Sequence, residues 1–194
     1  MIATLRGTIG KQIPNKCTVD VNGVGYAVSV PLNVWEALDE GKEVLLHISP
    51  YIREDRFDLY GFLDAKSKTF FERLIDLQGI GPRTGLELCA VPRLFLLQAI
   101  HEQDPKILLS VKGIGKKTAE KLLVDLKSLM EKQPELFEDP RNPAGLVPAQ
   151  IDHDAVDALT QLGYTAPVIL RALQELPKDL TSTEERITAV LRSL

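Results

Sequence analysis

The first 63 residues alternate between apolar and polar positions, as the residues of half-buried strands do. Alternating or apolar runs cover residues 18–22, 26–30, 44–48 and 59–62. The first two runs flank Asn22-Gly23, a dipeptide typical of a tight β-hairpin turn. A short helix is expected at residues 33–38, with Asn33 as its cap. Several short strands in about 60 residues favour a small β-barrel such as an OB-fold.

From residue 64 the apolar spacing becomes helical. Phe70, Phe71 and Leu74 recur on one helical face, and this helix is expected to end at Gly79. A second helix begins near Pro82, further short helices follow, and a longer amphipathic helix runs to about residue 132. Residues 64–132 therefore predict an all-helical module.

The last third of the chain predicts a linker and a small helical bundle. Residues 133–151 contain four prolines and few apolar residues, a composition typical of an extended, mobile linker. Residues 152–194 return to helical spacing, with Thr165 as a candidate cap and Ser182 and Glu185 at capping-box spacing. Three short helices are expected there.

Composition narrows the function classes. Of 194 residues, 44% are hydrophobic and 26% charged, which is ordinary for a globular protein. No apolar run approaches the roughly 20 residues of a membrane span, and residues 1–12 contain no long apolar stretch, so a secretory signal is not expected. Cys17 and Cys89 lie far apart, and the three histidines are isolated, so no metal-ligand cluster is visible. We therefore expect a cytoplasmic protein with neither metal nor cofactor.

The net charge of −4 hides a segregation of charge along the chain. Residues 1–63 carry 6 basic and 8 acidic side chains, and residues 134–194 carry 5 and 10. Residues 64–133 carry 12 basic and 9 acidic side chains, so only this segment has a net positive charge. A basic module suits the binding of phosphates.

That basic segment contains the same short pattern twice, 34 residues apart: GIGPRTG at 79–85 and GIGKKTAEK at 113–121. Paired glycines permit a sharp turn, after which the free amides and positive dipole of a helix N-terminus can bind an anion. Such contacts grip the DNA backbone without reading bases. The predicted DNA-binding residues are Gly79, Ile80, Gly81, Arg83 and Thr84 in the first copy and Gly113, Ile114, Gly115, Lys116, Lys117 and Thr118 in the second. The isoleucines are expected to point inward and fix the turns.

Other motifs that use glycine fail on spacing. A P-loop would need glycine where Ser110 stands, and a dinucleotide fingerprint would need glycine at Thr84 after a strand. No Ser-His-Asp or Cys-His arrangement is readable. We expect no catalytic residues.

The two copies look like helix-hairpin-helix motifs, and their position after a β-barrel resembles the RuvA family of Holliday-junction-binding proteins. Five stretches carry this resemblance, in order along nearly the whole chain: residues 1–7, 21–26, 53–62, 113–122 and 158–164. The resemblance implies an α+β multidomain protein. Its expected parts are an OB-fold at 1–63, a tandem helix-hairpin-helix domain at 64–132, a flexible linker at 133–151 and a three-helix, UBA-like bundle at 152–194.

The resemblance also implies partners and a role. Members of this family form homotetramers that hold a four-way junction open during branch migration in recombination and DNA repair, including the SOS response to DNA damage. They are non-catalytic subunits that recruit the RuvB AAA+ ATPase, and the RuvC endonuclease is a further partner. The expected location is the bacterial cytoplasm, at the nucleoid in use. Whether one or two tetramers hold a junction stays open.

Two further sites follow from the resemblance. Glu54 and Asp55 match acids that form a pin at the tetramer centre, where carboxylates repel phosphates and discourage continuous duplex. In the tail, Leu159, Leu162, Tyr164 and Leu170 are candidates for binding RuvB. One feature departs from the pattern: Gly85 is expected to cost its helix about 1 kcal/mol relative to alanine.

Two other functions stay open at this point. The first is a repair nuclease or glycosylase, for which Asp76, Glu87 and Asp125 would be the acids, although their spacing resembles helix surface charges. The second is a general DNA-binding adaptor without preference for junctions. Cleavage of junction DNA in the presence of a divalent metal would identify a nuclease. A substrate preference that does not change when Glu54 and Asp55 are neutralised would identify an adaptor.

Overall fold

The computed structural model describes residues 1–138, 152–177, 180 and 182–193. Backbone contacts divide the chain into two compact units, residues 1–90 and 91–194. The first glycine turn thus belongs to the first unit and the second turn to the second unit. No helix in the described ranges is long and apolar enough to cross a bilayer. The domain boundaries at 63, 132 and 151 remain predictions.

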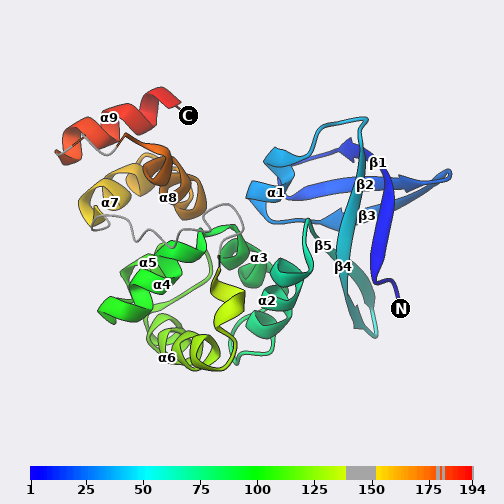
Figure 1. The fold of residues 1–194 in the computed structure, drawn as a ribbon, viewed down its shortest axis with the longest axis horizontal. Helices are drawn as coiled ribbons and strands as arrows, with labels where there is room; N and C mark the ends of the chain where they lie inside the picture. The colour runs from blue at the N-terminus through cyan, green and yellow to red at the C-terminus, as the bar shows by residue number, and fades with distance from the viewer. Residues whose placement is uncertain (139–151, 178–179, 181, 194) are drawn as a thin grey trace. The chain divides into compact units, whose positions relative to one another are not determined.

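Five strands of the first unit close a barrel in the order β1-β2-β3-β5-β4 (Figure 1). They are β1 (Thr4–Lys11), β2 (Lys16–Val21), β3 (Val24–Ser29), β4 (Glu43–Arg53) and β5 (Arg56–Phe62). All neighbouring pairs are antiparallel except β3 and β5, which pair in parallel. The predicted barrel and the Asn22-Gly23 hairpin are confirmed.

Strand β1 closes the barrel, and the hydrophobic pattern did not predict it. It pairs with β4 over Thr4–Thr8 and with β2 over Thr8–Lys11. Gly7 lies where the partners change, and a Cβ atom there would lie 2.0 Å from the backbone oxygen of Asp20. Glycine is therefore required for β1 to approach β2 this closely.

The barrel core contains Leu5, Ile9, Cys17, Val19, Leu46 and Ile48, all buried. Burial raises the pKa of the Cys17 thiol to about 11, so the thiol stays protonated at neutral pH. Trp35, the only tryptophan, packs against this core, and its indole nitrogen donates to the Lys16 carbonyl oxygen at 3.2 Å. Trp35 is thus a natural probe of barrel folding.

The short helix α1 (Leu32–Ala37) appears where a helix was expected, but the predicted cap is wrong. Pro31 occupies the N-cap position, and no side chain accepts a hydrogen bond there. Proline suits this place because its fixed φ favours the start of a helix.

Two helices complete the first unit, and four helical segments of the second unit follow. Asp64 caps α2 (Ala65–Ile75) by accepting a hydrogen bond from the Ser67 amide at 2.7 Å. The remaining segments are α3 (Pro82–Ala90), α4 (Arg93–Glu102), α5 (Lys106–Leu109), α6 (Lys116–Lys132) and the 3-10 helix η1 (Pro134–Phe137).

The start of the predicted linker is folded, which corrects that prediction for residues 134–137. In η1, Leu136 and Phe137 are buried, and η1 packs against α4 and α6. Burial of these two apolar side chains stabilises this short segment, although its proline and polar neighbours resemble a linker. Residues 139–151 of the predicted linker lie outside the described residues.

Three helices near the C-terminus pack on one another, as expected: α7 (His153–Gln161), α8 (Ala166–Glu175) and α9 (Thr183–Ser193). The capping box is confirmed, since the Glu185 amide donates to Ser182 Oγ at 3.2 Å and the Ser182 amide to Glu185 Oε2 at 3.3 Å. Thr165 occupies the N-cap position of α8 but accepts no capping hydrogen bond.

Candidate nucleic-acid interface

The first glycine turn connects α2 to α3. Gly79 has a φ of 92°, a left-handed conformation that glycine adopts without strain. The Ile80 amide donates to the Leu77 carbonyl oxygen at 3.1 Å, and the first bond of α3 runs from the Gly85 amide to the Gly81 oxygen at 2.9 Å. The turn is therefore fixed by its own backbone.

The second turn, between α5 and α6, repeats this geometry. Gly113 also has a φ of 92°. The Ile114 amide donates to the Val111 oxygen at 3.2 Å, and the Ala119 amide donates to the Gly115 oxygen at 2.8 Å. The sequence repeat is thus a structural repeat, hydrogen bond for hydrogen bond.

Both turns leave helix amides available for a ligand. Gly115 is the N-cap of α6, and because it has no side chain it cannot cap the first turn of the helix. Within the described residues, the amides of Lys116, Lys117 and Thr118 have no hydrogen-bond acceptor. The amides of Arg83 and Thr84 are equally free at the start of α3 in that part of the chain. Such amides, at the positive end of a helix dipole, suit a phosphate.

The side chains of the two turns divide into an inner and an outer set. Ile80 and Ile114 are buried, so they hold the turns from within and do not face a ligand. Arg83, Lys116 and Lys117 are exposed beside the free amides. A Cβ atom on Gly81 or Gly115 would meet no atom within 4 Å, so both positions face open space. Each turn thus presents glycine backbone and cationic side chains outward.

Gly85 is a packing requirement, which corrects its interpretation as a weakness of the first motif. A Cβ atom there would lie 3.0 Å from Ile75 Cγ2 and 3.1 Å from Phe71 Cε2. Phe71 is fully buried, with its ring centroid 5.0 Å from those of Tyr60 and Phe62. Any Cβ atom at position 85 would therefore push against two packed side chains, and glycine lets α3 approach α2 this closely without displacing them.

Gly85→Leu is expected to lower the free energy of unfolding of the first unit by about 2 to 3 kcal/mol, because overpacking must displace Phe71 or separate the helices. Denaturant unfolding followed by Trp35 fluorescence measures this. Gly81→Ala is the matched control, since its methyl group enters open space. Equal stability of the Gly85→Leu variant and the native chain would show that the α2–α3 contact is loose.

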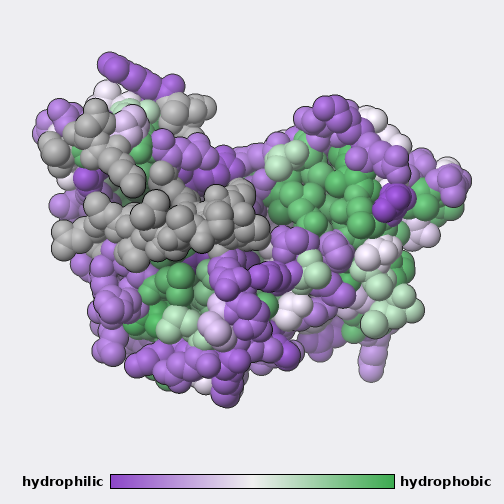
Figure 2. Space-filling view, in the orientation of Figure 1, coloured by the Kyte–Doolittle hydropathy of each residue, from purple (hydrophilic) through white to green (hydrophobic). Residues whose placement is uncertain are grey.

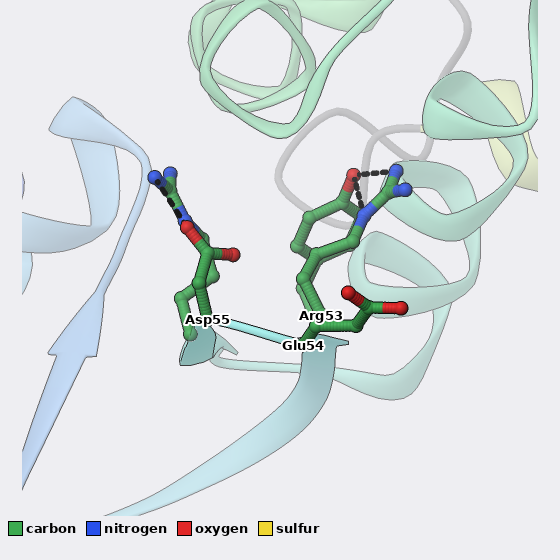
Figure 3. A pocket seen from close by; sticks show the side chains of 5 residues that line it. Arg53, Glu54 and Asp55 are labelled. Carbon is green, nitrogen blue, oxygen red and sulfur yellow. Dashed lines mark hydrogen bonds and ion pairs between the residues drawn. The ribbon is translucent and has the colours of Figure 1, made fainter.

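A second candidate site lies at the tip of the β4–β5 hairpin, where Glu54 and Asp55 form the turn. Tyr51, Arg53 and Arg56 line a shallow depression with them (Figure 3). The Arg53 guanidinium lies 4.8 Å from the centroid of the Tyr51 ring, and its Nε donates to the Tyr51 hydroxyl at 2.9 Å. Nη2 of Arg53 donates to the same oxygen. Two arginines therefore flank the two acids in sequence, and the nearer contacts of Arg53 are with Tyr51.

Aromatic contacts connect this hairpin to α2. The Tyr51 ring meets Tyr60 edge-on at 6.4 Å, and Tyr60 in turn meets Phe71 at 5.0 Å. Burial raises the pKa of Tyr60, with smaller contributions from Asp58 and Tyr51, so its hydroxyl stays neutral at physiological pH. Since Phe71 also packs against Gly85, continuous packing links the hairpin to the helix that follows the first glycine turn.

The four tail candidates separate by burial. Leu159 and Leu170 are fully buried, so they are core residues and present no surface to a partner in this structure. Leu162, at the C-terminal end of α7, is 60% exposed, and Tyr164 is half-buried. Helical spacing predicts which side chains share a face but not which of them a neighbouring helix covers.

The acids considered for a nuclease lie on three different helices. Asp76 is the exposed C-cap of α2, Glu87 lies on α3, and Asp125 lies on α6 of the second unit. Among the described residues, no group of three or more His, Cys, Asp and Glu side chains could hold a metal ion.

Sequence reasoning missed Tyr51, Arg53 and Arg56 as site residues. The sequence signal for the two arginines was their position on either side of Glu54 and Asp55. The hydroxyl of Tyr51 gave no signal, because only the alternation of β4 places it on the same face as Arg53.

Comparisons with known proteins agree with this architecture. A family model described as the RuvA N terminal domain matches residues 1–61, and one described as a SAM-like helix-hairpin-helix tandem matches residues 71–128, which include both turns. A Pseudomonas fluorescens protein named Holliday junction branch migration complex subunit RuvA is 37% identical, with all of both chains covered. Proteins of the same name from Pelobacter propionicus and Geobacter sulfurreducens are 37% and 36% identical, over at least 99% of this chain and 96% of theirs. The chain belongs to the RuvA family.

Proposed function

We propose that this protein binds four-way DNA junctions by their structure and holds them open as the non-catalytic subunit of a branch-migration complex. The observation that carries the proposal is the pair of geometrically equivalent glycine turns, each with free helix amides and exposed cations. Amide and cation contacts to phosphates are indifferent to base sequence, so selectivity must come from the shape of the DNA. Relatives named as branch-migration subunits support the same role.

Selectivity for junctions is assigned to the hairpin tip. Glu54 and Asp55 are exposed at the tip, so continuous duplex would have to approach both carboxylates. Where strands diverge at a crossover, the phosphates can lie around the tip. Repulsion then penalises duplex more than a junction, which is how an acidic group on a DNA-binding face gives specificity.

Association of copies is assigned to the first unit. Figure 2 shows apolar side chains gathered over the barrel on the face turned to the viewer. Ile52 and Phe57 pair directly across β4 and β5, yet they are 63% and 56% exposed. Exposed apolar pairs of this kind favour contact with another subunit, and a homotetramer is proposed.

An ATPase of the RuvB kind is proposed as the partner of the C-terminal helices, in the bacterial cytoplasm. Leu162 is the predicted contact, because it is a large apolar side chain in solvent. Leu162→Glu should weaken binding of RuvB by about tenfold, since a charge then enters an apolar contact. Its exposure leaves the fold intact, and circular dichroism checks this. Unchanged binding by light scattering or calorimetry would remove Leu162 from the contact.

The central test compares a four-way junction with linear duplex of the same sequence, titrated with the full-length protein over a salt series. Affinity should fall steeply with salt for both, because phosphate contacts release counterions. We expect a junction preference of at least about tenfold that persists near 0.15 M salt, where charges are screened beyond about 8 Å. Equal binding to both would overturn the junction proposal and leave a general DNA adaptor.

A further inference from the structure

The two acids at the hairpin tip have different surroundings. Asp55 Oδ2 lies 3.5 Å from Nη2 of Arg56. Glu54 has no hydrogen bond or ion pair to any residue that the structure describes, and no dashed line reaches its carboxylate in Figure 3. The pair therefore does not present two equal charges.

The hairpin also has a charge problem that its side chains resolve locally. Arg53 and Arg56 face each other as the last residue pair of β4 and β5. Like charges directly opposite each other across two strands repel. Each arginine instead has its own partner: Arg53 stacks on Tyr51 and donates to its hydroxyl, and Arg56 pairs with Asp55. These partners hold the two guanidinium groups in separate places.

The position of Arg53 decides how negative the tip is. Arg53 is adjacent to Glu54 in sequence, so a free guanidinium could turn toward that carboxylate and offset its charge. Tyr51 lies on the same face of β4 as Arg53, because alternate residues of a strand share a face. By holding Arg53 through its hydroxyl and its ring, Tyr51 leaves Glu54 without a countercharge.

We propose that Tyr51 and Arg56 set the charge of this tip, so that Glu54 alone supplies most of its repulsion of continuous duplex. Tyr51 acts as a positioning residue that keeps Arg53 away from Glu54, and Arg56 attenuates Asp55. The inference rests on the proposed function for its biological meaning, but its test is duplex affinity, which is measured whether or not junctions are preferred.

The experiment measures the affinity of full-length variants for linear duplex near 0.05 M salt, where screening between the tip and phosphates is weak. Glu54→Gln should raise duplex affinity by about three- to tenfold, and Asp55→Asn by less than about twofold. Arg56→Gln alone should lower duplex affinity. In a chain that already carries Arg56→Gln, Asp55→Asn should raise duplex affinity as much as Glu54→Gln does in the native chain. Glu43→Gln is the control, since Glu43 is exposed at the other end of β4, roughly 30 Å along the strand.

Tyr51→Phe isolates the positioning role, because it keeps the ring and its contact with Tyr60 but removes the hydroxyl acceptor. Duplex affinity should rise by about twofold to threefold as Arg53 becomes free to approach Glu54. Tyr51→Phe should no longer raise duplex affinity when it is combined with Arg53→Gln. A merely structural role of Tyr51 would not make its effect depend on Arg53. Trp35 fluorescence confirms that each variant is folded.

Equal effects of Glu54→Gln and Asp55→Asn, or no effect of either, would overturn the inference. A Tyr51→Phe effect that persists without Arg53 would overturn the positioning role. The junction affinity of the native protein, measured in parallel, judges the proposed function separately, since it does not enter the ranking of variants on duplex.

Discussion

Gly81→Glu combined with Gly115→Glu is expected to reduce DNA binding by about 100-fold or more while the chain stays folded. The reason is local: each carboxylate would stand beside the free helix amides and compete with the phosphate for them. It would also offset the charge of Arg83 or of Lys116 and Lys117. Neither change strains the backbone, because a Cβ atom at either glycine meets nothing within 4 Å, and Gly115 has a φ of −90°.

The measurement is equilibrium binding to junction and duplex DNA, with thermal unfolding of the same samples. Val124→Glu is the matched control, since it adds the same charge to α6 at a residue that is 67% exposed and two turns or more beyond Gly115. Binding that survives the two glutamates, in variants whose unfolding is unchanged, would mean that the turns only connect helices.

Gly7→Ala is expected to have the largest effect on stability, at about 3 kcal/mol or more. A Cβ atom at this position would lie 2.0 Å from the Asp20 oxygen and 2.8 Å from its carbonyl carbon. These are backbone atoms, so no rotamer change relieves the overlap, and β1 must move away from β2. The barrel would then lose the strand that closes it.

Trp35 fluorescence during denaturant unfolding reports this loss for the barrel. The control is Gly10→Ala, three residues along the same strand, where a Cβ atom would meet Thr18 Cβ at an ordinary 3.8 Å. Loss of backbone freedom alone would change stability similarly in both variants. Comparable stability of Gly7→Ala and Gly10→Ala would therefore contradict the steric account.

The barrel and the two turns were predictable because their signals are local. The Asn22-Gly23 hairpin, the alternation of β2 and β3, and the two Gly-Ile-Gly patterns depend only on neighbouring residues. Strand β1 was missed because glycines and polar residues dilute its alternation, leaving Leu5 and Ile9 as its buried positions. Its strand character depends on pairing with β2 and β4, which the sequence does not reveal.

Apart from the cap of α1, the errors concern contacts between residues that are distant in sequence. Helix propensity depends only on the residue itself, so Gly85 was interpreted as weakening its helix. The structure shows instead that the Phe71 ring on another helix leaves little space for a side chain at position 85. The equivalent residue of the second copy, 34 positions later, is the fully buried Ala119, so a small side chain occupies both places. Leu159 and Leu170 were assigned to a surface for the same reason, since only packing distinguishes core from interface.

The closed order of the strands limits how this protein can aggregate or extend its sheet. Strand β3 pairs with β5 only at Val28 and Ser29, so Val24–Ala27 is the stretch of β3 whose outer edge lacks a neighbour within residues 1–90. Pairing of a strand from another chain with this sheet is confined to such stretches. The corresponding part of β5 contains Arg56 and Asp58, and these charged side chains disfavour the pairing of a further strand there. Copies of the barrel can therefore associate through side-chain contacts at high concentration, while backbone pairing that would join their sheets is disfavoured.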